Sequence, residues 1–476
     1  MRAPFIGRET ALSDLHALYL RRAPSIAVIK GRRRIGKSRL VTEFAAQHPK
    51  ARFFSFSALA PQPEFTAQMQ RDYFGRQLAH LVGLPPMTFE DWTDAFYHLS
   101  IHVKDGDIVL FDEISWMGMQ DNTFVSKLKA WWDLQTANIL LVMCGSVSTW
   151  IQENILNSTA FFGRIALTIS LEPLSISESA TLLKQLGFKG SALEVYKILA
   201  VMGGIPWYLE QINPQLMADD NLKKMCFESD GLLVAEFDKI FHDLFGNTGA
   251  IYKKILHALK EGPKTLAELK QALDYANSGT FSQKMEHLKI AGFVQRHYQW
   301  ALKTGGLRKQ YLYRLSDPYI RFYLKMIEPE REQIAQGKFK KVDIARRPGF
   351  DGIIGLQLEN LLVQNRALLL EAVGVQPGDC QCDGPYRQAQ TARHKGCQID
   401  YLIQTIPHNL FVCEFKVTKG TLMAGMISEV EERIKRLAIP RGFAAVPVLF
   451  HLGEVASSVY DRNFFYKIIN IEDFLG

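Results

Sequence analysis

Long apolar runs are missing from the 476-residue sequence, and their absence argues against a membrane-spanning segment. No stretch approaches the roughly 18 uninterrupted apolar residues that a spanning helix requires. The opening segment, MRAPFIGRETALSDL, also lacks the apolar core of a secretory signal. We therefore expect a cytoplasmic protein with no membrane partner.

Cysteines are scarce as well, and none of them forms a C-x-x-C pair. Six cysteines in a chain of this length fit a reducing compartment. Cys380 and Cys382 are one residue apart with no second pair nearby, which favours ordinary thiols over a zinc site. The formal net charge of +7 permits a nucleic-acid partner without requiring one.

A phosphate-loop pattern, G-x-x-x-x-G-K-S, stands near the start of the chain in IAVIKGRRRIGKSRL, residues 26–40. An apolar run precedes it and apolar residues at helical spacing follow it, so we predict strand, loop and helix in that order. Lys37 is then expected to reach the β- and γ-phosphates of a nucleotide, and Ser38 to place its hydroxyl on Mg²⁺. The arginines of the loop are expected to contribute backbone N–H groups while their side chains are solvated. The residues predicted to bind the nucleotide here are Gly31, Arg32, Arg33, Arg34, Ile35, Gly36, Lys37, Ser38 and Arg39.

Two acids end a second apolar run, DIVLFDEIS, residues 107–115. Ligands of open α/β sheets bind beyond the carboxyl ends of the strands, where these acids are expected to face a triphosphate. Asp112 is predicted to hold Mg²⁺ through water, and Glu113 to polarise the attacking water. Ser146 follows a third apolar run. It either senses the γ-phosphate or is a plain strand-to-turn serine, and the sequence leaves both interpretations open.

Together, FIGRETALSDL, the phosphate loop, LFDE, CGS, FFGR and GGIPWYL resemble the archaeal-type ATPases of the AAA+/STAND group of P-loop proteins. The resemblance covers roughly residues 1–230. It implies that Gly7, Arg8 and Glu9 form a box close to the nucleotide. It also implies that the glycine-proline element at Gly203 to Pro206 contacts or senses the nucleotide from a helical lid, and a plain interhelical turn is the alternative for this element. It also implies that Arg164 is a finger acting on a neighbouring copy, although a surface ion pair explains an arginine there equally well.

Residues 246–330 show a different pattern, in which three helical segments are followed by a strand-like hairpin. This order is typical of a winged helix-turn-helix. The helix Thr280–Ala291 would be its recognition helix, with Gln283, Lys284 and His287 on the exposed side. Such a module either contacts DNA or packs between domains. The basic run at residues 336–349 is expected to include a hinge or an exposed loop.

A second chemical pattern occupies the C-terminal region, in GCQIDYLIQTIPHNLFVCEFKVTKG. We predict a hairpin with strands at residues 398–404 and 410–417. It would bring Asp400 close to Glu414 and Lys416, a set suited to a divalent cation and a nucleophilic water. Glu359, on a preceding helix, is predicted to add a metal ligand. The D…E-x-K pattern after a glutamate-bearing helix resembles the restriction-endonuclease-like, PD-(D/E)xK nucleases, with Ile399 in place of the proline. A structural ion pair between Glu414 and Lys416 is the alternative.

The sequence therefore predicts an α/β protein with a P-loop, AAA+-like parallel sheet and a helical lid, then a winged helix and an α/β restriction-endonuclease-like domain. The expected domains are residues 1–170, 171–245, 246–330, a linker at 331–349, and 350–476. The expected function is Mg²⁺-dependent binding and hydrolysis of ATP, coupled to modules that face DNA, in a chain that can form homo-oligomers. The alternative is a nucleotide-dependent switch, binding ATP or ADP, whose nuclease-like domain is inactive.

Overall fold

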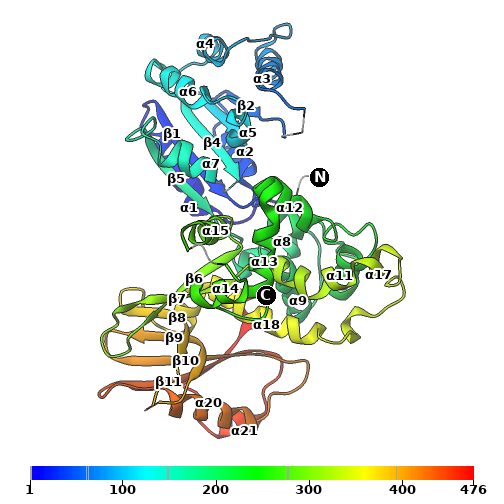
Figure 1. Ribbon diagram of the computed structural model, residues 1–476, viewed down its shortest axis with the longest axis vertical. Helices are drawn as coiled ribbons and strands as arrows, with labels where there is room; N and C mark the ends of the chain where they lie inside the picture. Colours follow the sequence, from blue (N-terminus) through cyan, green and yellow to red (C-terminus); the bar gives the residue numbers. More distant parts are fainter. Residues whose placement is uncertain are drawn as a thin grey trace. The chain divides into compact units, whose positions relative to one another are not determined.

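The computed structural model describes residues 3–60, 62, 64–146, 149–275, 278–392 and 394–475. The chain divides into two compact units (Figure 1). The first unit is Phe5–Pro173. The second unit is Leu174–Gly476, and the residues before Phe5 belong to it as well. Within the described part of the chain, we find no helix with the length and apolar character needed to cross a membrane.

A parallel sheet forms the centre of the first unit, with five strands among the described residues, in the order β2-β3-β4-β1-β5. The strands are β1 (Ser25–Gly31), β2 (Phe53–Ser57), β3 (Ile108–Asp112), β4 (Leu140–Ser146) and β5 (Ile165–Leu171). Because β4 lies between β1 and β3, the carboxyl ends of these three strands meet at one edge of the sheet. Ligands of open α/β sheets bind at such an edge.

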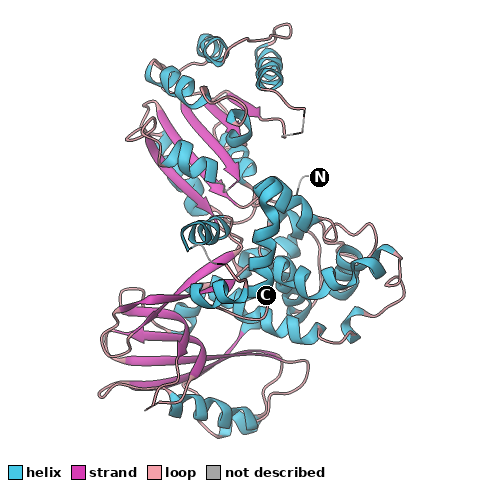
Figure 2. Cartoon of the chain, viewed as in Figure 1, coloured by secondary structure: helices cyan, strands magenta, loops and turns pink. Residues whose placement is uncertain are grey.

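Helices pack along this sheet (Figure 2). They are α1 (Glu9–Tyr19), α2 (Lys37–Ala46), α3 (Ala67–Val82), α4 (Trp92–His102), α5 (Ile114–Gly118), α6 (Phe124–Asp133) and α7 (Thr149–Ile151). The rings of Phe74, Phe96 and Phe111 lie within 6.2 Å of one another, centroid to centroid, between α3, α4 and β3. Burying one such ring stabilises the fold by roughly 2–3 kcal/mol. This aromatic core fixes β3, and therefore the acids at its end.

The second unit begins with helices α8 (Ile176–Gln185), α9 (Ala192–Met202), α10 (Pro206–Leu209), α11 (Ala218–Phe227) and α12 (Glu236–Phe245). The start of α8 shows why the chain turns helical there. The Ser175 hydroxyl accepts the N–H of Glu178, whose carboxylate accepts the N–H of Ser175 in return. This reciprocal pair satisfies two backbone donors that a helix start leaves open.

Three helices and an antiparallel ribbon follow, in the order that the sequence predicted. They are α13 (Gly249–Leu259), α14 (Leu266–Ala272), α15 (Ser278–Ile290), β6 (Val294–Trp300) and β7 (Leu307–Leu315). One side-chain prediction was wrong, because His287 does not project freely from α15. Its Nδ1 lies 2.7 Å from the hydroxyl of Tyr252 on α13, so this ring packs between the two helices. Gln283 is exposed, as expected.

The segment expected to be a linker, residues 331–349, is exposed over most of its length and is anchored by a few buried apolar residues. It contains α17 (Arg331–Ala335) and a short 3₁₀ turn at Ile344–Arg346, and it follows α16 (Pro318–Phe322). Phe339 is buried, and the Arg347 guanidinium lies 4.6 Å above its ring while it bonds the Glu330 carboxylate. Most residues at 336–349 are exposed, in line with the expected hinge or exposed loop, while Phe339 and Ile344 anchor the segment.

A mixed sheet closes the second unit, with five strands among the described residues in the order β12-β11-β10-β9-β8. They are β8 (Cys380–Gln388), β9 (Cys397–Thr405), β10 (Asn409–Val417), β11 (Ala444–Leu452) and β12 (Lys467–Asn470). The β9–β10 pair is the predicted antiparallel hairpin, whereas β10, β11 and β12 run parallel. The associated helices are α18 (Phe350–Gln364), α19 (Arg366–Val373), α20 (Gly425–Arg436) and α21 (Ser457–Asp461). Helix α18 packs against β10, and α20 against β9.

Candidate functional site

The loop between β1 and α2 has the backbone of a phosphate cradle. Arg34 and Gly36 both adopt left-handed conformations, with φ of 68° and 96°. A Cβ on Gly31 would lie 2.8 Å from the carbonyl oxygen of Leu171, which is closer than a side-chain carbon tolerates. Glycine is therefore needed at Gly31 for space and at Gly36 for conformation. The loop ends at the start of α2, whose first N–H groups favour an anion.

Lys37, the first residue of α2, extends back over this loop and is buried, with 5% of its surface exposed. Its Nζ donates to the carbonyl oxygens of Gly31 and Arg32, both at 3.3 Å, and lies 3.9 Å from Oε1 of Glu113. These are weaker partners for an ammonium than a phosphate would be. The lysine is thus held in the cradle by contacts that a bound phosphate can replace.

Ser38 and Asp112 meet beside the loop. The serine hydroxyl donates to Oδ2 of Asp112 at 2.7 Å, while Oδ1 is buried and has no hydrogen-bond partner among the described residues. Burial raises the pKa of this carboxyl, and the Ser38 hydrogen bond opposes that rise. A hydroxyl next to an unsatisfied carboxylate oxygen is a donor set that suits Mg²⁺. The two residues predicted to hold the metal therefore fit it.

Glu113 is held in place by Ser146, a contact that the sequence did not predict. The Ser146 backbone N–H donates to one carboxylate oxygen and its hydroxyl to the other, each at 3.1 Å. Glu113 itself adopts a left-handed conformation, with φ of 53°. Such strain persists only where surrounding contacts hold it. Ser146, at the end of β4, is thus a positioning residue for the acid at the end of β3.

The arginines around the site are less exposed than predicted. Arg33 lies 5.7 Å above the ring of Trp116, and Arg39 lies 5.9 Å above that of Phe5. The expectation that the loop side chains are solvated was wrong for Arg33, because a nearby aromatic face attracts the cation. Arg8 joins the end of β5 to the loop, donating to the carbonyl oxygens of Glu172 at 2.7 Å and Ile35 at 3.4 Å.

Two further residues, Arg164 and Pro206, were predicted to serve the nucleotide. Arg164 makes a two-pronged ion pair with Asp133, at 2.7 and 3.2 Å, and Lys129 binds the same carboxylate at 2.7 Å. The hydrogen bond from Arg164 is the main cause that lowers the pKa of Asp133 to about 2. Pro206 is the first residue of α10 and belongs to the second unit.

A second cluster forms on the β9–β10 hairpin. Oδ2 of Asp400 accepts the N–H of Phe415 at 3.1 Å, so the aspartate lies directly beside β10. Glu414 is buried and bonds Lys416 at 2.9 Å and Arg433 at 2.5 Å. Arg433 also lies 3.7 Å from Oδ1 of Asp400. Burial, then the neighbouring Glu414 and Glu359, raise the pKa of Asp400 to about 7.

The predicted set of three metal-binding carboxylates does not form. Glu359 is engaged by Arg314, whose Nη1 lies 2.5 Å from Oε1 of the glutamate. In the described ranges, no group of three or more His, Cys, Asp or Glu side chains is placed to share a metal ion. Sequence reasoning missed both Arg314 and Arg433. Arg433 follows Val430 of the buried face of α20 by three residues, which was the one available signal that it points toward the sheet.

Comparison with known proteins agrees with the geometry of the first unit. Residues 5–212 match the model of a family described as an ATPase domain predominantly from Archaea. The matched segment includes the loop between β1 and α2 and the acids at the end of β3. An uncharacterized protein of Methanocaldococcus jannaschii is 26% identical over 338 residues, which are 70% of this chain and 71% of that protein.

Solved structures overlap the chain at low similarity. The ORC2 protein of Aeropyrum pernix, solved as ADPNP–ADP complexes, covers 71% of this chain and 96% of its own, with 14% identity and a TM-score of 0.42. The RuvB Holliday junction branch migration motor of Thermotoga maritima covers 61% of this chain and 90% of its own, with 15% identity and a TM-score of 0.36.

Proposed function

We propose that the chain hydrolyses ATP with Mg²⁺ at the loop between β1 and α2. The observation that carries this proposal is the 2.7 Å contact between Ser38 and Asp112, whose second oxygen is buried without a partner. Two metal ligands from separate elements are thereby assembled directly beside the phosphate lysine. The match of residues 5–212 to an ATPase family supports the same function.

The residues of the site have separable roles in this proposal. The loop N–H groups and Lys37 bind and orient the phosphates, and Ser38 and Asp112 are the residues that would hold Mg²⁺. When bound, the metal would neutralise charge on the phosphate oxygens. Glu113, fixed by Ser146, accepts a proton from the attacking water. Arg164 would serve a neighbouring copy's nucleotide only after releasing Asp133, so we propose the ion pair as its state in a single chain.

The test is multiple-turnover phosphate release from ATP. Glu113→Gln should lower the turnover rate by about 100-fold or more, since a positioned general base contributes at least that much, and should leave ATP binding intact. Lys37→Ala should lose binding as well. Wild-type rates in Glu113→Gln protein would refute the assignment of the base, and tight ATP binding without turnover in the wild type would favour a nucleotide-dependent switch.

A second candidate function is metal-dependent cleavage of DNA, with the α13–β7 module as a winged helix that contacts the strand. One observation favours it, namely the convergence of Asp400, Glu414 and Lys416 across the hairpin. Arg433 now supplies the positive charge that a divalent cation would supply. Cutting therefore requires the cation to displace this guanidinium. Plasmid nicking in Mn²⁺ that disappears in Asp400→Ala would support cleavage, and no nicking by the wild type would leave the domain as a binding module.

A further inference from the structure

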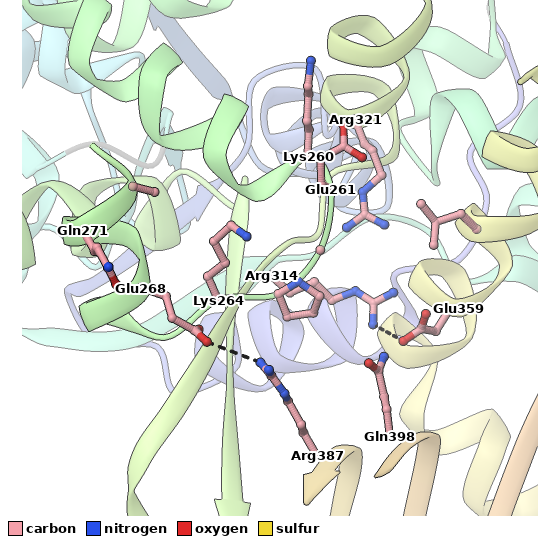
Figure 3. Close-up of a pocket in the computed structure, with 14 residues that line it drawn as sticks. Lys260, Glu261, Lys264, Glu268, Gln271, Arg314, Arg321, Glu359, Arg387 and Gln398 are labelled. Carbon is pink, nitrogen blue, oxygen red and sulfur yellow. Dashed lines mark hydrogen bonds and ion pairs between the residues drawn. The ribbon is translucent and has the colours of Figure 1, made fainter. Parts of the chain in front are cut away.

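A cavity of about 710 Å³ lies in the second unit, and Glu359, whose charge also acts on Asp400, is part of its wall (Figure 3). Its wall comes from the turn between α13 and α14, from α14 itself, from β7, α16 and α18, and from the neighbouring strands β8 and β9. Small-molecule sites typically occupy about 300–1,000 Å³, so the cavity has the size for a ligand as large as a nucleotide.

Positive charge dominates this cavity. Five cationic side chains line it, and they are Lys260, Lys264, Arg314, Arg321 and Arg387. Three acids line it as well, but each already has a cation. Glu261 bonds Lys325 at 3.0 Å, Glu268 lies 3.7 Å from Arg387, and Glu359 bonds Arg314 at 2.5 Å.

Arg321 and Lys264 remain without an acidic partner within ion-pair distance among the described residues. In Figure 3 their charged ends face the interior of the cavity, whereas Lys260 directs its ammonium away from it. Both are held firmly. The backbone of Lys264 exchanges two hydrogen bonds with Tyr313 of β7, at 2.9 and 2.7 Å, and Arg321 donates one guanidinium nitrogen to the carbonyl of Leu315.

The Arg321 guanidinium is the strongest evidence for a ligand. The residue has 2% of its surface exposed, and its Nε is buried with no hydrogen-bond partner among the described residues. Burial, and then the nearby Arg314, lower the pKa of Arg321 to about 9. A buried, unpaired cation is costly, and a bound anion with several acceptor oxygens removes that cost.

We propose that this cavity binds a phosphate-bearing ligand of nucleotide size, with Arg321 and Lys264 on the phosphate. Arg314, fixed by Glu359 and Asn360, forms the floor beside them. The ligand is anionic because the surplus charge is positive, and phosphate fits because a guanidinium donates to two of its oxygens at once. A free nucleotide and a short strand end offer the same group, and the experiment separates them.

The experiment uses full-length protein carrying Lys37→Ala, so that binding at the P-loop is suppressed. Calorimetric titrations with pyrophosphate, ADP and a 5′-phosphorylated hexanucleotide are compared at low salt. Pyrophosphate and ADP should bind, and Lys264→Glu should weaken both by about tenfold or more, as the loss of a charged contact predicts. The matched control is Lys254→Glu, an exposed lysine on α13 outside the cavity, which should leave both affinities unchanged.

Arg321→Gln provides a second variant, checked for folding by circular dichroism. A folded Arg321→Gln protein should lose pyrophosphate binding. If this variant does not fold, the Lys264→Glu titrations alone test the proposal. Absence of binding by all three probes, or equal weakening by Lys254→Glu, would overturn the proposal. Binding of the hexanucleotide alone, sensitive to Lys264→Glu, would overturn the free nucleotide as the source and identify a strand end.

Discussion

Asp112 is a carboxylate whose surroundings disfavour its ionised form. The carboxylate is largely buried. One of its oxygens accepts a hydrogen bond from the Ser38 hydroxyl, and the other has no hydrogen-bond partner among the described residues. Burial raises its pKa, which means that the folded chain pays to keep it ionised. Proteins retain such groups where a ligand later compensates them.

Replacing Asp112 by asparagine therefore has opposite effects on stability and activity. We expect Asp112→Asn to keep or raise the free energy of unfolding of the nucleotide-free protein, by up to about 1 kcal/mol, because a neutral amide is cheaper to bury. ATP turnover should fall by about tenfold or more, since a metal ligand is lost. Urea denaturation and phosphate release measure the two quantities.

The control for that substitution is Asp14→Asn, on the exposed side of α1. It removes the same charge from the same unit and should change neither quantity. A marked loss of stability in Asp112→Asn alone would contradict the description of Asp112 as a buried acid that is costly to keep ionised, and would indicate that its ionised form stabilises the fold.

At the scale of elements, the β6–β7 ribbon carries a half-buried histidine, His297, that links the stability of the fold to pH. Nε2 of His297 is buried with no hydrogen-bond partner among the described residues. Burial, and then Arg314, lower the pKa of His297 to about 3. Between pH 6.5 and about 3 the unfolded chain therefore binds a proton that the folded chain does not.

This difference predicts the direction of the pH effect. The contribution of His297 to stability is complete above pH 6.5 and is lost as the pH falls toward 3. The expected slope is on the order of 1 kcal/mol per pH unit. Urea midpoints at pH 7.5 and 4.5 should differ less in His297→Gln than in the wild type. His242→Gln, at an exposed histidine of the same unit, should behave as the wild type does, and identical behaviour of both variants would contradict the prediction.

Elements were predictable where their signal is contiguous in the sequence. The β9–β10 hairpin, the strand before the P-loop and the helix after it were predicted close to their observed bounds. The anchoring of residues 331–349 was not predictable, because the segment is basic in composition and only a few apolar residues hold it. The ring of Phe339 packs at a tilt against that of Phe227, more than a hundred residues earlier, and no local pattern encodes that contact.

At the scale of the whole molecule, the proposed ATP site and the C-terminal sheet belong to different compact units. A ligand that binds only the folded form stabilises the unit that holds it. Saturation with Mg²⁺ and a non-hydrolysable ATP analogue at about 100 times the dissociation constant should stabilise the Phe5–Pro173 unit by about 2.7 kcal/mol.

Hydrogen exchange is the measurement that assigns this effect to a unit. Amides of α2, β3 and β4 should exchange more slowly with the analogue in the wild type and not in Lys37→Ala. Protection around Lys264 that survives Lys37→Ala would instead indicate that the analogue binds in the cavity of the second unit. Protection of β1–β5 that also survives Lys37→Ala would contradict the role of this lysine in binding.

The sequence alone determined the local parts of this protein, namely the glycine loop with its lysine, the acids at the end of a buried strand, and the D…E-x-K hairpin. Each depends on residues close together in the chain, where spacing translates directly into geometry. The tertiary structure decided which side chains meet across elements. Ser146 on Glu113, Asp133 on Arg164, Arg314 on Glu359 and Arg433 on Glu414 join residues from 19 to 45 positions apart. Such pairs depend on strand register and helix packing, which single-sequence periodicity does not specify.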